Sequence, residues 1–138
     1  MITRKLIKKS REKAMKFLTK HQQKGKKSSI YSASKYMLRS DDFSINYKLA
    51  FKLLNNIHFF FDHVNQHWAE TDGTCIWLNS FKDYKNDKDN ILTDTLIHEA
   101  LHDVILRNNR HIIPEEKEHK IMELVYPSLI SPKYRFFK

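Results

Sequence analysis

The stretch Thr95-Leu96-Ile97-His98-Glu99-Ala100-Leu101-His102 places two histidines four positions apart. In an α-helix, residues four apart lie one above the other on the same face, so His98 and His102 can direct two imidazole nitrogens at one metal ion. Glu99 lies beside them, where it can accept a proton from a metal-bound water. Two imidazoles leave room for a third protein ligand and for water, which is the arrangement of catalytic zinc. The stretch therefore predicts a zinc site with Glu99 as general base.

The residues around this motif predict a largely buried helix over about 91–108. Its apolar positions recur at helical spacing and are Ile91, Leu92, Leu96, Leu101, Val104, Ile105 and Leu106. Asn90 or Thr93 can cap the start of this helix, and Asp94 suits its first turn. The alternative interpretation is that the motif residues lie on a solvated face, or are core histidines with hydrogen-bond partners.

A third ligand is predicted in the segment 114–126, which opens with Pro and two acids and so favours a second helix. Glu118 lies on the same face of this helix as Ile121, Met122 and Val125. That face is expected to turn toward the core, where a carboxylate needs a metal or a cation as partner. Glu118 is therefore the predicted ligand, and Glu115 and His119 remain alternatives.

The order of these elements resembles the zincin metallopeptidases and, among them, the small gluzincins called minigluzincins. The residues that agree with the small or uncharged positions of that group are Thr95, Ala100, Leu101 and Val104, whereas Asp103 departs from them. The resemblance covers about residues 70–132. It implies zinc-dependent hydrolysis of peptide bonds, with His98, His102 and Glu118 as metal ligands and Glu99 as general base. Gluzincins often use a Tyr or His to steady the oxyanion, and the candidates here are His111, His119, Tyr126 and Tyr134.

Two strands and a further helix are predicted between the basic N-terminal segment and the motif. The aromatic-rich run 57–64 and the run 74–80 predict strands that pair as an antiparallel hairpin, with a turn at 70–73. A helix is predicted from about residue 43 to 54, starting at the acidic stretch 40–42. The histidines of the first run and its flank are interpreted as ordinary surface or rim residues, because alternation puts His58 on the face opposite His63 and His67.

The resemblance also implies that the second strand forms the rim of a substrate cleft. An extended peptide could then pair with the exposed edge of this strand. The substrate would be held by main-chain groups of Cys75, Ile76, Trp77, Leu78 and Asn79. The fold class that follows is α+β, with a small antiparallel sheet, an active-site helix, a Glu-bearing helix and a basic N-terminal helix.

Positive charge is concentrated at the N-terminal end of the chain. Residues 1–39 carry 13 Lys and Arg and one acid, a net charge of +12, whereas residues 40–138 carry −3. An amphipathic helix is predicted over about 3–23. Its basic face is either the solvated side of a packed helix or a phosphate-binding surface for nucleic acid or a membrane. Between the two phosphate-bearing partners, nucleic acid is favoured over membrane, because the apolar positions of this helix are few.

Length and composition predict an intracellular globular protein. At 138 residues, with 41% hydrophobic residues, the chain suits a single core, organised as a basic segment (1–39) and a zincin-like domain (40–138). It has no apolar run of membrane-spanning length and no apolar stretch typical of a secretory signal. Cys75 is the single cysteine, so no disulfide within the chain is expected. The alternative functions are a catalytically inactive zincin-like binding domain, or a nucleic-acid-binding protein with a structural metal site.

Overall fold

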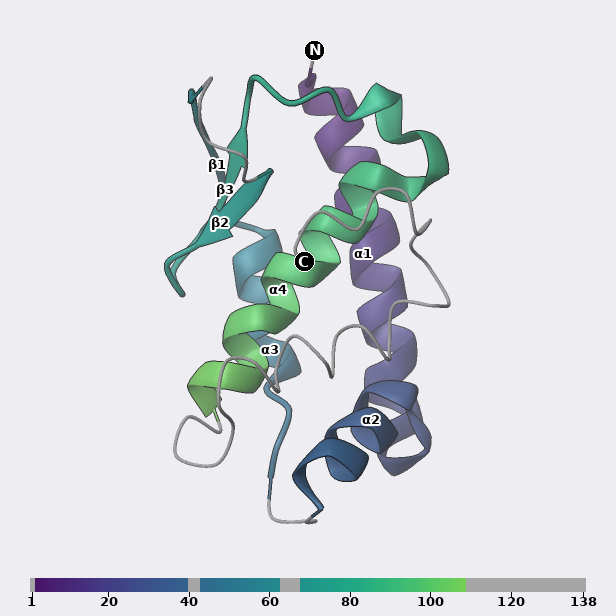
Figure 1. Ribbon diagram of the computed structural model, residues 1–138. Helices are drawn as coiled ribbons and strands as arrows, with labels where there is room; N and C mark the ends of the chain where they lie inside the picture. Colours follow the sequence, from purple (N-terminus) through teal and green to yellow (C-terminus); the bar gives the residue numbers. More distant parts are fainter. Residues whose placement is uncertain (1, 40–42, 63–67, 109–138) are drawn as a thin grey trace.

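The computed structural model describes residues 2–39, 43–62 and 68–108 and has an α+β architecture (Figure 1). The helices are α1 (Arg4–Lys24), α2 (Ser29–Leu38), α3 (Tyr47–Leu54) and α4 (Ile91–Asn108), with two short 3-10 helices, η1 (Gly25–Lys27) and η2 (Lys85–Asn90). The strands are β1 (Ile57–Phe60), β2 (Ala69–Thr71) and β3 (Ile76–Asn79). The predicted helix over 114–126, with Glu118 and its alternatives, lies outside the described residues. None of the helices in the described part is long and apolar enough to cross a membrane.

Helix α1 packs against α4 (Figure 1). Thr3 caps its first turn by accepting a hydrogen bond from the Leu6 amide at 3.1 Å, and the helix ends at Gly25, whose φ of 54° favours glycine. Ala14 and Leu18 belong to the central hydrophobic cluster. The predicted helix over 3–23 is thus confirmed. The boundary at residue 39 marks a change in charge, while one core continues across it.

Helices α2 and α3 are each capped by a side chain. Ser28 accepts a hydrogen bond from the Ile30 amide at 3.0 Å, which starts α2 directly after the short turn η1. The Asn46 side chain accepts from the Leu49 amide at 3.0 Å, so α3 starts at Tyr47, a few residues later than predicted. Both helices bury apolar residues in the central cluster, among them Ile30 and Leu53.

The sheet is mixed, with the strand order β1-β3-β2. Strand β1 runs parallel to β3, and β2 runs antiparallel to β3. The predicted antiparallel pairing of the runs 57–64 and 74–80, and with it an all-antiparallel sheet, is therefore wrong. The reason is a tight turn after β2: Asp72 accepts hydrogen bonds from the Thr74 and Cys75 amides at 2.8 and 3.0 Å. This turn pairs β3 with its immediate neighbour in sequence and leaves β1 to join on the other side.

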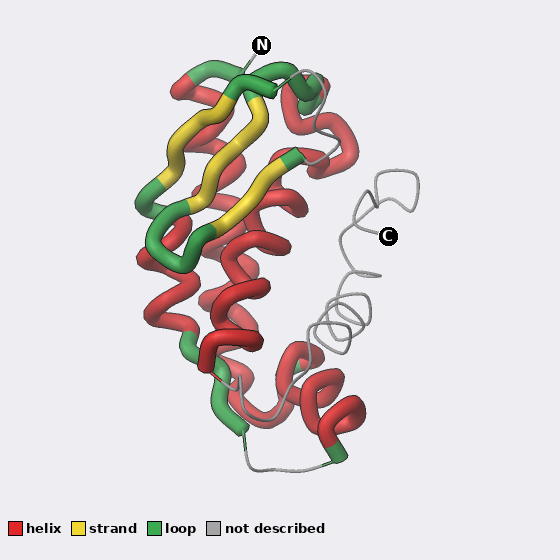
Figure 2. Tube along the Cα trace, turned by 60° about the vertical axis from the view of Figure 1, so that its left-hand side comes forward, coloured by secondary structure: helices red, strands yellow, loops and turns green. Residues whose placement is uncertain are grey.

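Strand β3 lies in the middle of the sheet, so the expectation that it offers an exposed edge is also wrong. Its hydrogen-bonding groups face β1 on one side and β2 on the other. The two sheet edges belong to β1 and β2. Ile76 and Leu78 are fully buried in the central cluster, and Figure 2 shows the three strands in front of the helices, with no described helix on their outer face.

Candidate functional site

The candidate site lies on α4, which occupies the centre of the described molecule. The predicted helix over about 91–108 is confirmed as Ile91–Asn108. Every residue from 91 to 101 is buried, because α1, α3 and β2 all pack against this helix. A helical stretch that is buried on all sides need not be amphipathic, so the polar residues within 91–101 are features that packing alone does not require.

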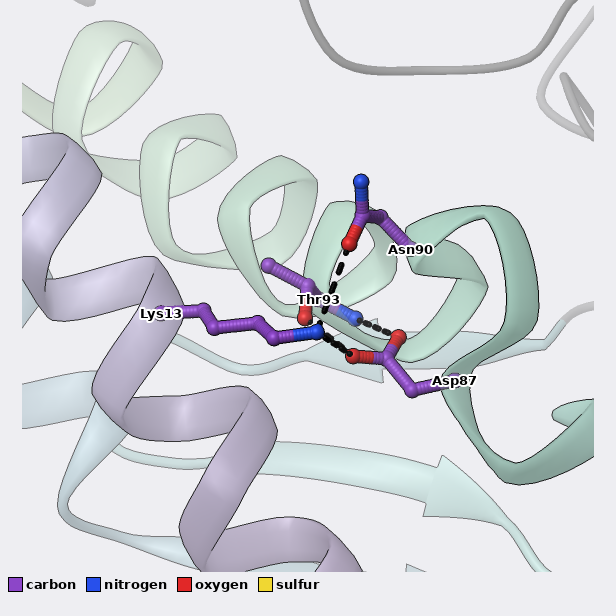
Figure 3. Close-up of polar contacts among 4 residues, drawn as sticks. All are labelled: Lys13, Asp87, Asn90 and Thr93. Atoms are coloured by element: carbon purple, nitrogen blue, oxygen red, sulfur yellow. Dashed lines mark hydrogen bonds and ion pairs between the residues drawn. The ribbon is translucent and has the colours of Figure 1, made fainter.

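The N-terminus of α4 is fixed by a polar cluster of four residues (Figure 3). Asp87 accepts hydrogen bonds from the Thr93 amide at 2.9 Å and from the Thr93 hydroxyl at 2.6 Å. The Lys13 ammonium, from α1, lies 3.2 Å from the same carboxylate and 3.5 Å from the Asn90 side-chain oxygen. The carboxylate that accepts the Thr93 amide in the first turn is thus that of Asp87, and the prediction of Asn90 or Thr93 as the cap missed it.

A second carboxyl group, that of Asp94, lies near this cluster. Burial works to raise the pKa of Asp87, but the Thr93 hydrogen bonds and the Lys13 charge hold it below its usual value. Asp94 is 2% exposed, and neither of its oxygens has a hydrogen-bond partner within the described part of the chain. Burial and the nearby Asp87 charge raise the pKa of Asp94 to about 8, against the influence of Lys13. Asp94 is therefore mostly protonated at neutral pH.

His98 and Glu99 lie two turns into α4, inside the molecule. They are 5% and 7% exposed, and the His98 Nε2 atom lies 3.8 Å from the Glu99 Oε1 atom. The backbone of α4 continues as a regular helix through residue 108, so position 102 lies one turn beyond position 98 on the same face. The side chain of His102 lies outside the part of the structure that is described.

Tyr84 is a neighbour of Glu99 that the sequence did not reveal. Its hydroxyl donates a hydrogen bond to the Trp68 carbonyl oxygen, and its ring meets the Trp68 ring edge-on with centroids 5.2 Å apart. Tyr84 is 2% exposed, and burial raises the pKa of its phenol, with the Glu99 charge acting in the same direction. Glu99 thus lies near the Tyr84 phenol, whose hydroxyl is hydrogen-bonded to Trp68, the residue just before β2. The one sequence signal was a single aromatic residue in the polar loop 82–90.

The predicted residues are brought together only in part. His98 and Glu99 are adjacent in the interior, while Glu118, Glu115 and the oxyanion candidates lie beyond residue 108. Within residues 2–39, 43–62 and 68–108, no group of three His, Cys, Asp or Glu is arranged to hold a metal ion. Of the predicted substrate-binding residues, Ile76 to Asn79 form the central strand, and Cys75 is buried just before it.

Comparisons with protein-family models, curated proteins and solved structures found no match.

Proposed function

We propose that this chain is a zinc-dependent metallopeptidase of the gluzincin type. The observation that best supports the proposal is the H-E-x-x-H sequence in the buried part of a regular helix, with His98 and Glu99 side by side in the interior. A helix that serves only the core would carry apolar residues at these two positions, because burying a histidine and a glutamate is costly. A site with chemistry to perform accounts for both of them.

The donor set suits zinc. His98 and His102 supply two imidazoles from one helix face, and Glu118 supplies a carboxylate from beyond the described residues. Zinc bound there would polarise a water molecule and the carbonyl of the scissile peptide bond. Glu99 accepts a proton from the attacking water and returns it to the leaving nitrogen. The enclosed position of Glu99 strengthens its electrostatic influence on a nearby reacting group.

The substrate edge in this proposal is that of β2, since β3 has no free edge. The Asn79 amide donates to the Trp68 carbonyl at 2.9 Å, so by alternation the main-chain groups of Ala69 and Thr71 point away from β3. Strand β2 packs against α4, and the hydrogen bond from Tyr84 to Trp68 joins the start of β2 to the surroundings of Glu99. An extended peptide added to this edge would therefore lie beside the motif helix.

The test combines zinc content with peptidase activity. Protein purified without added metal should hold about one zinc per chain, as the donor set of a single catalytic site requires. His98→Ala and His102→Ala should lose the zinc. Glu99→Gln should keep it and lose roughly two to four orders of magnitude in hydrolysis of a denatured protein substrate. Elemental analysis and a protease assay measure the two quantities.

His58→Ala is the matched control, because His58 is exposed and bonds Asn56 at 2.9 Å. It should leave zinc and activity unchanged. Zinc retained in both motif variants would exclude the site, and a Glu99→Gln protein as active as the parent would exclude the catalytic role. A parent protein that holds zinc but shows no peptidase activity would favour the inactive binding domain. Loss of zinc in Glu115→Ala or His119→Ala, but not in Glu118→Ala, would reassign the third ligand.

A second candidate function, nucleic-acid binding, is favoured by the exposed basic face of α1. The exposed Lys and Arg of this helix are Arg4, Lys5, Lys8, Lys9, Lys13, Lys16, Lys20 and Lys24. Its opposite side is packed in the core, so removing residues 1–39 would unfold the protein and cannot serve as the test. Changing Lys5, Lys9 and Lys16 to Gln should instead weaken binding to duplex DNA. The slope of log affinity against log salt concentration should become shallower by about 0.9 for each phosphate that is no longer neutralised. Unchanged binding would mean that this face is only solvated.

A further inference from the structure

The outer face of the sheet carries a hollow of about 280 Å³, lined by Phe60, Glu70, Thr71, Asp72 and Trp77. Glu70 and Trp77 are paired across β2 and β3, so their side chains lie on the same face of the sheet. The Trp77 indole is held in place on two sides. The His58 ring packs on the indole, with ring centroids 5.1 Å apart. The indole Nε1–H of Trp77 donates a hydrogen bond to the Asp72 Oδ2 atom at 3.5 Å.

The hollow combines aromatic faces with negative charge. Hydrogen bonds from the Thr74 hydroxyl, and from the Thr74 and Cys75 amides, hold the pKa of Asp72 well below its usual value, so this carboxylate stays ionised. Glu70 is exposed and adds a second carboxylate. Phe60 and Trp77 supply the two aromatic side chains.

The surrounding sequence is unusual for this chain. The chain has 25 Lys and Arg and a net charge of +9, yet no Lys or Arg occurs between Lys52 and Lys82. The acids of this interval are Asp62, Glu70 and Asp72. The strands of this strongly basic protein thus carry no Lys or Arg, and the hollow lies on their outer face.

We infer that this hollow binds an organic cation, namely the guanidinium or ammonium group of a basic side chain in a peptide. The faces of Trp77 and Phe60 attract a cation through their ring quadrupoles, and the alkyl part of a Lys or Arg side chain covers their apolar surface. The carboxylates of Glu70 and Asp72 add charge-assisted hydrogen bonds. The volume of the hollow suits a single side chain of a partner. This site contains none of the proposed zinc ligands and does not depend on the peptidase function.

The experiment uses the full chain labelled with ¹⁵N and follows the indole signals of its two tryptophans. Trp68, which does not line the hollow, is the internal reference. Titration with acetyl-Gly-Arg-Gly-amide should shift the Trp77 indole signal in a saturable way. The same peptide with citrulline, a neutral isostere of arginine, should leave it in place. Tetramethylammonium should compete with the arginine peptide, because both present an organic cation.

Two variants with equal charge change sharpen the test. Glu70→Gln should weaken binding of the arginine peptide roughly two- to fivefold, because one exposed carboxylate is removed. Glu12→Gln, on the distant basic face of α1, should bind as the parent does. Equal shifts with the citrulline peptide, or equal affinities of Glu70→Gln and Glu12→Gln, would overturn the assignment. A response to tetramethylammonium but not to the arginine peptide would overturn the peptide as the source of the cation.

Discussion

The two long helices, α1 and α4, lie against one another but carry different sequence patterns. Helix α1 buries one side and exposes a row of basic residues, whereas α4 is buried at every position from 91 to 101. On α1 the hydrophobic period shows which face packs. Over residues 91–101, α4 has no solvent-exposed face for a hydrophobic period to mark, so the buried polar residues are the informative ones. A row of charged residues on an amphipathic helix thus identifies its solvent-exposed surface, whereas ionisable residues inside a buried helix indicate a candidate functional site.

The largest effect is expected from emptying a core position on α1. Leu18 is fully buried in the central cluster, so Leu18→Ala should lower the free energy of unfolding by about 2–5 kcal/mol. Lys9→Ala, on the exposed side of the same helix, should change it by less than about 0.5 kcal/mol. Urea denaturation of the two variants gives both values. A small effect of Leu18→Ala would mean that α1 does not share the core with α4.

A smaller effect is expected from Asp94, the buried carboxyl group in the first turn of α4. Its folded-state pKa of about 8 lies above its ordinary value of 3.8, so between these values the folded protein binds more protons than the unfolded chain. Its contribution to stability is therefore lost as pH rises from about 4 to 8. Asp94→Asn removes this titration and should be more stable than the parent at pH 9 by about 1–3 kcal/mol, with a smaller difference at pH 5.

Denaturant titrations at pH 5 and pH 9 measure this change. Besides burial, the charges of Asp87 and Lys13 shift the pKa of Asp94, so neither residue is altered in the test. Asp83→Asn is the control, because Asp83 is an exposed acid that accepts the Lys85 amide at 2.8 Å. If Asp94→Asn and the parent lose stability equally between the two pH values, Asp94 is ionised in the folded protein.

The smallest effect concerns the ion pair that joins α1 to the start of α4. The Lys13 side chain is 42% exposed, so Lys13→Met should lower the free energy of unfolding by only about 0.5–1 kcal/mol. A double-mutant cycle with Asp87→Asn isolates the pair, and its coupling should shrink in 1 M salt. Lys16→Met on the exposed face serves as control. Coupling that is unaffected by salt would point to packing of the lysine stem as its source.

What could be predicted from sequence was the part of the fold that depends on neighbours along the chain. Helix hydrogen bonds join residues four apart, so the bounds of α4, the helix α1 and the shared face of positions 98 and 102 follow from local patterns. Burial of His98 and Glu99 agrees with the prediction of a largely buried helix. The zinc ligands and the peptidase function stay predictions, with Glu118 outside the described residues.

Which distant residues meet follows from the packing of the whole chain. Lys13 reaches Asp87 across 74 positions, Tyr84 lies near Glu99, and β1 joins β3 in parallel although β2 lies between them in sequence. Strand pairing and side-chain contacts of this kind depend on which surfaces the whole chain must bury, and a local pattern of four to eight residues cannot specify a partner that lies elsewhere. Local sequence patterns specified α1, α3, α4 and the motif. Packing decided the sheet order, the place of β2 at one edge of the sheet and the surroundings of Glu99.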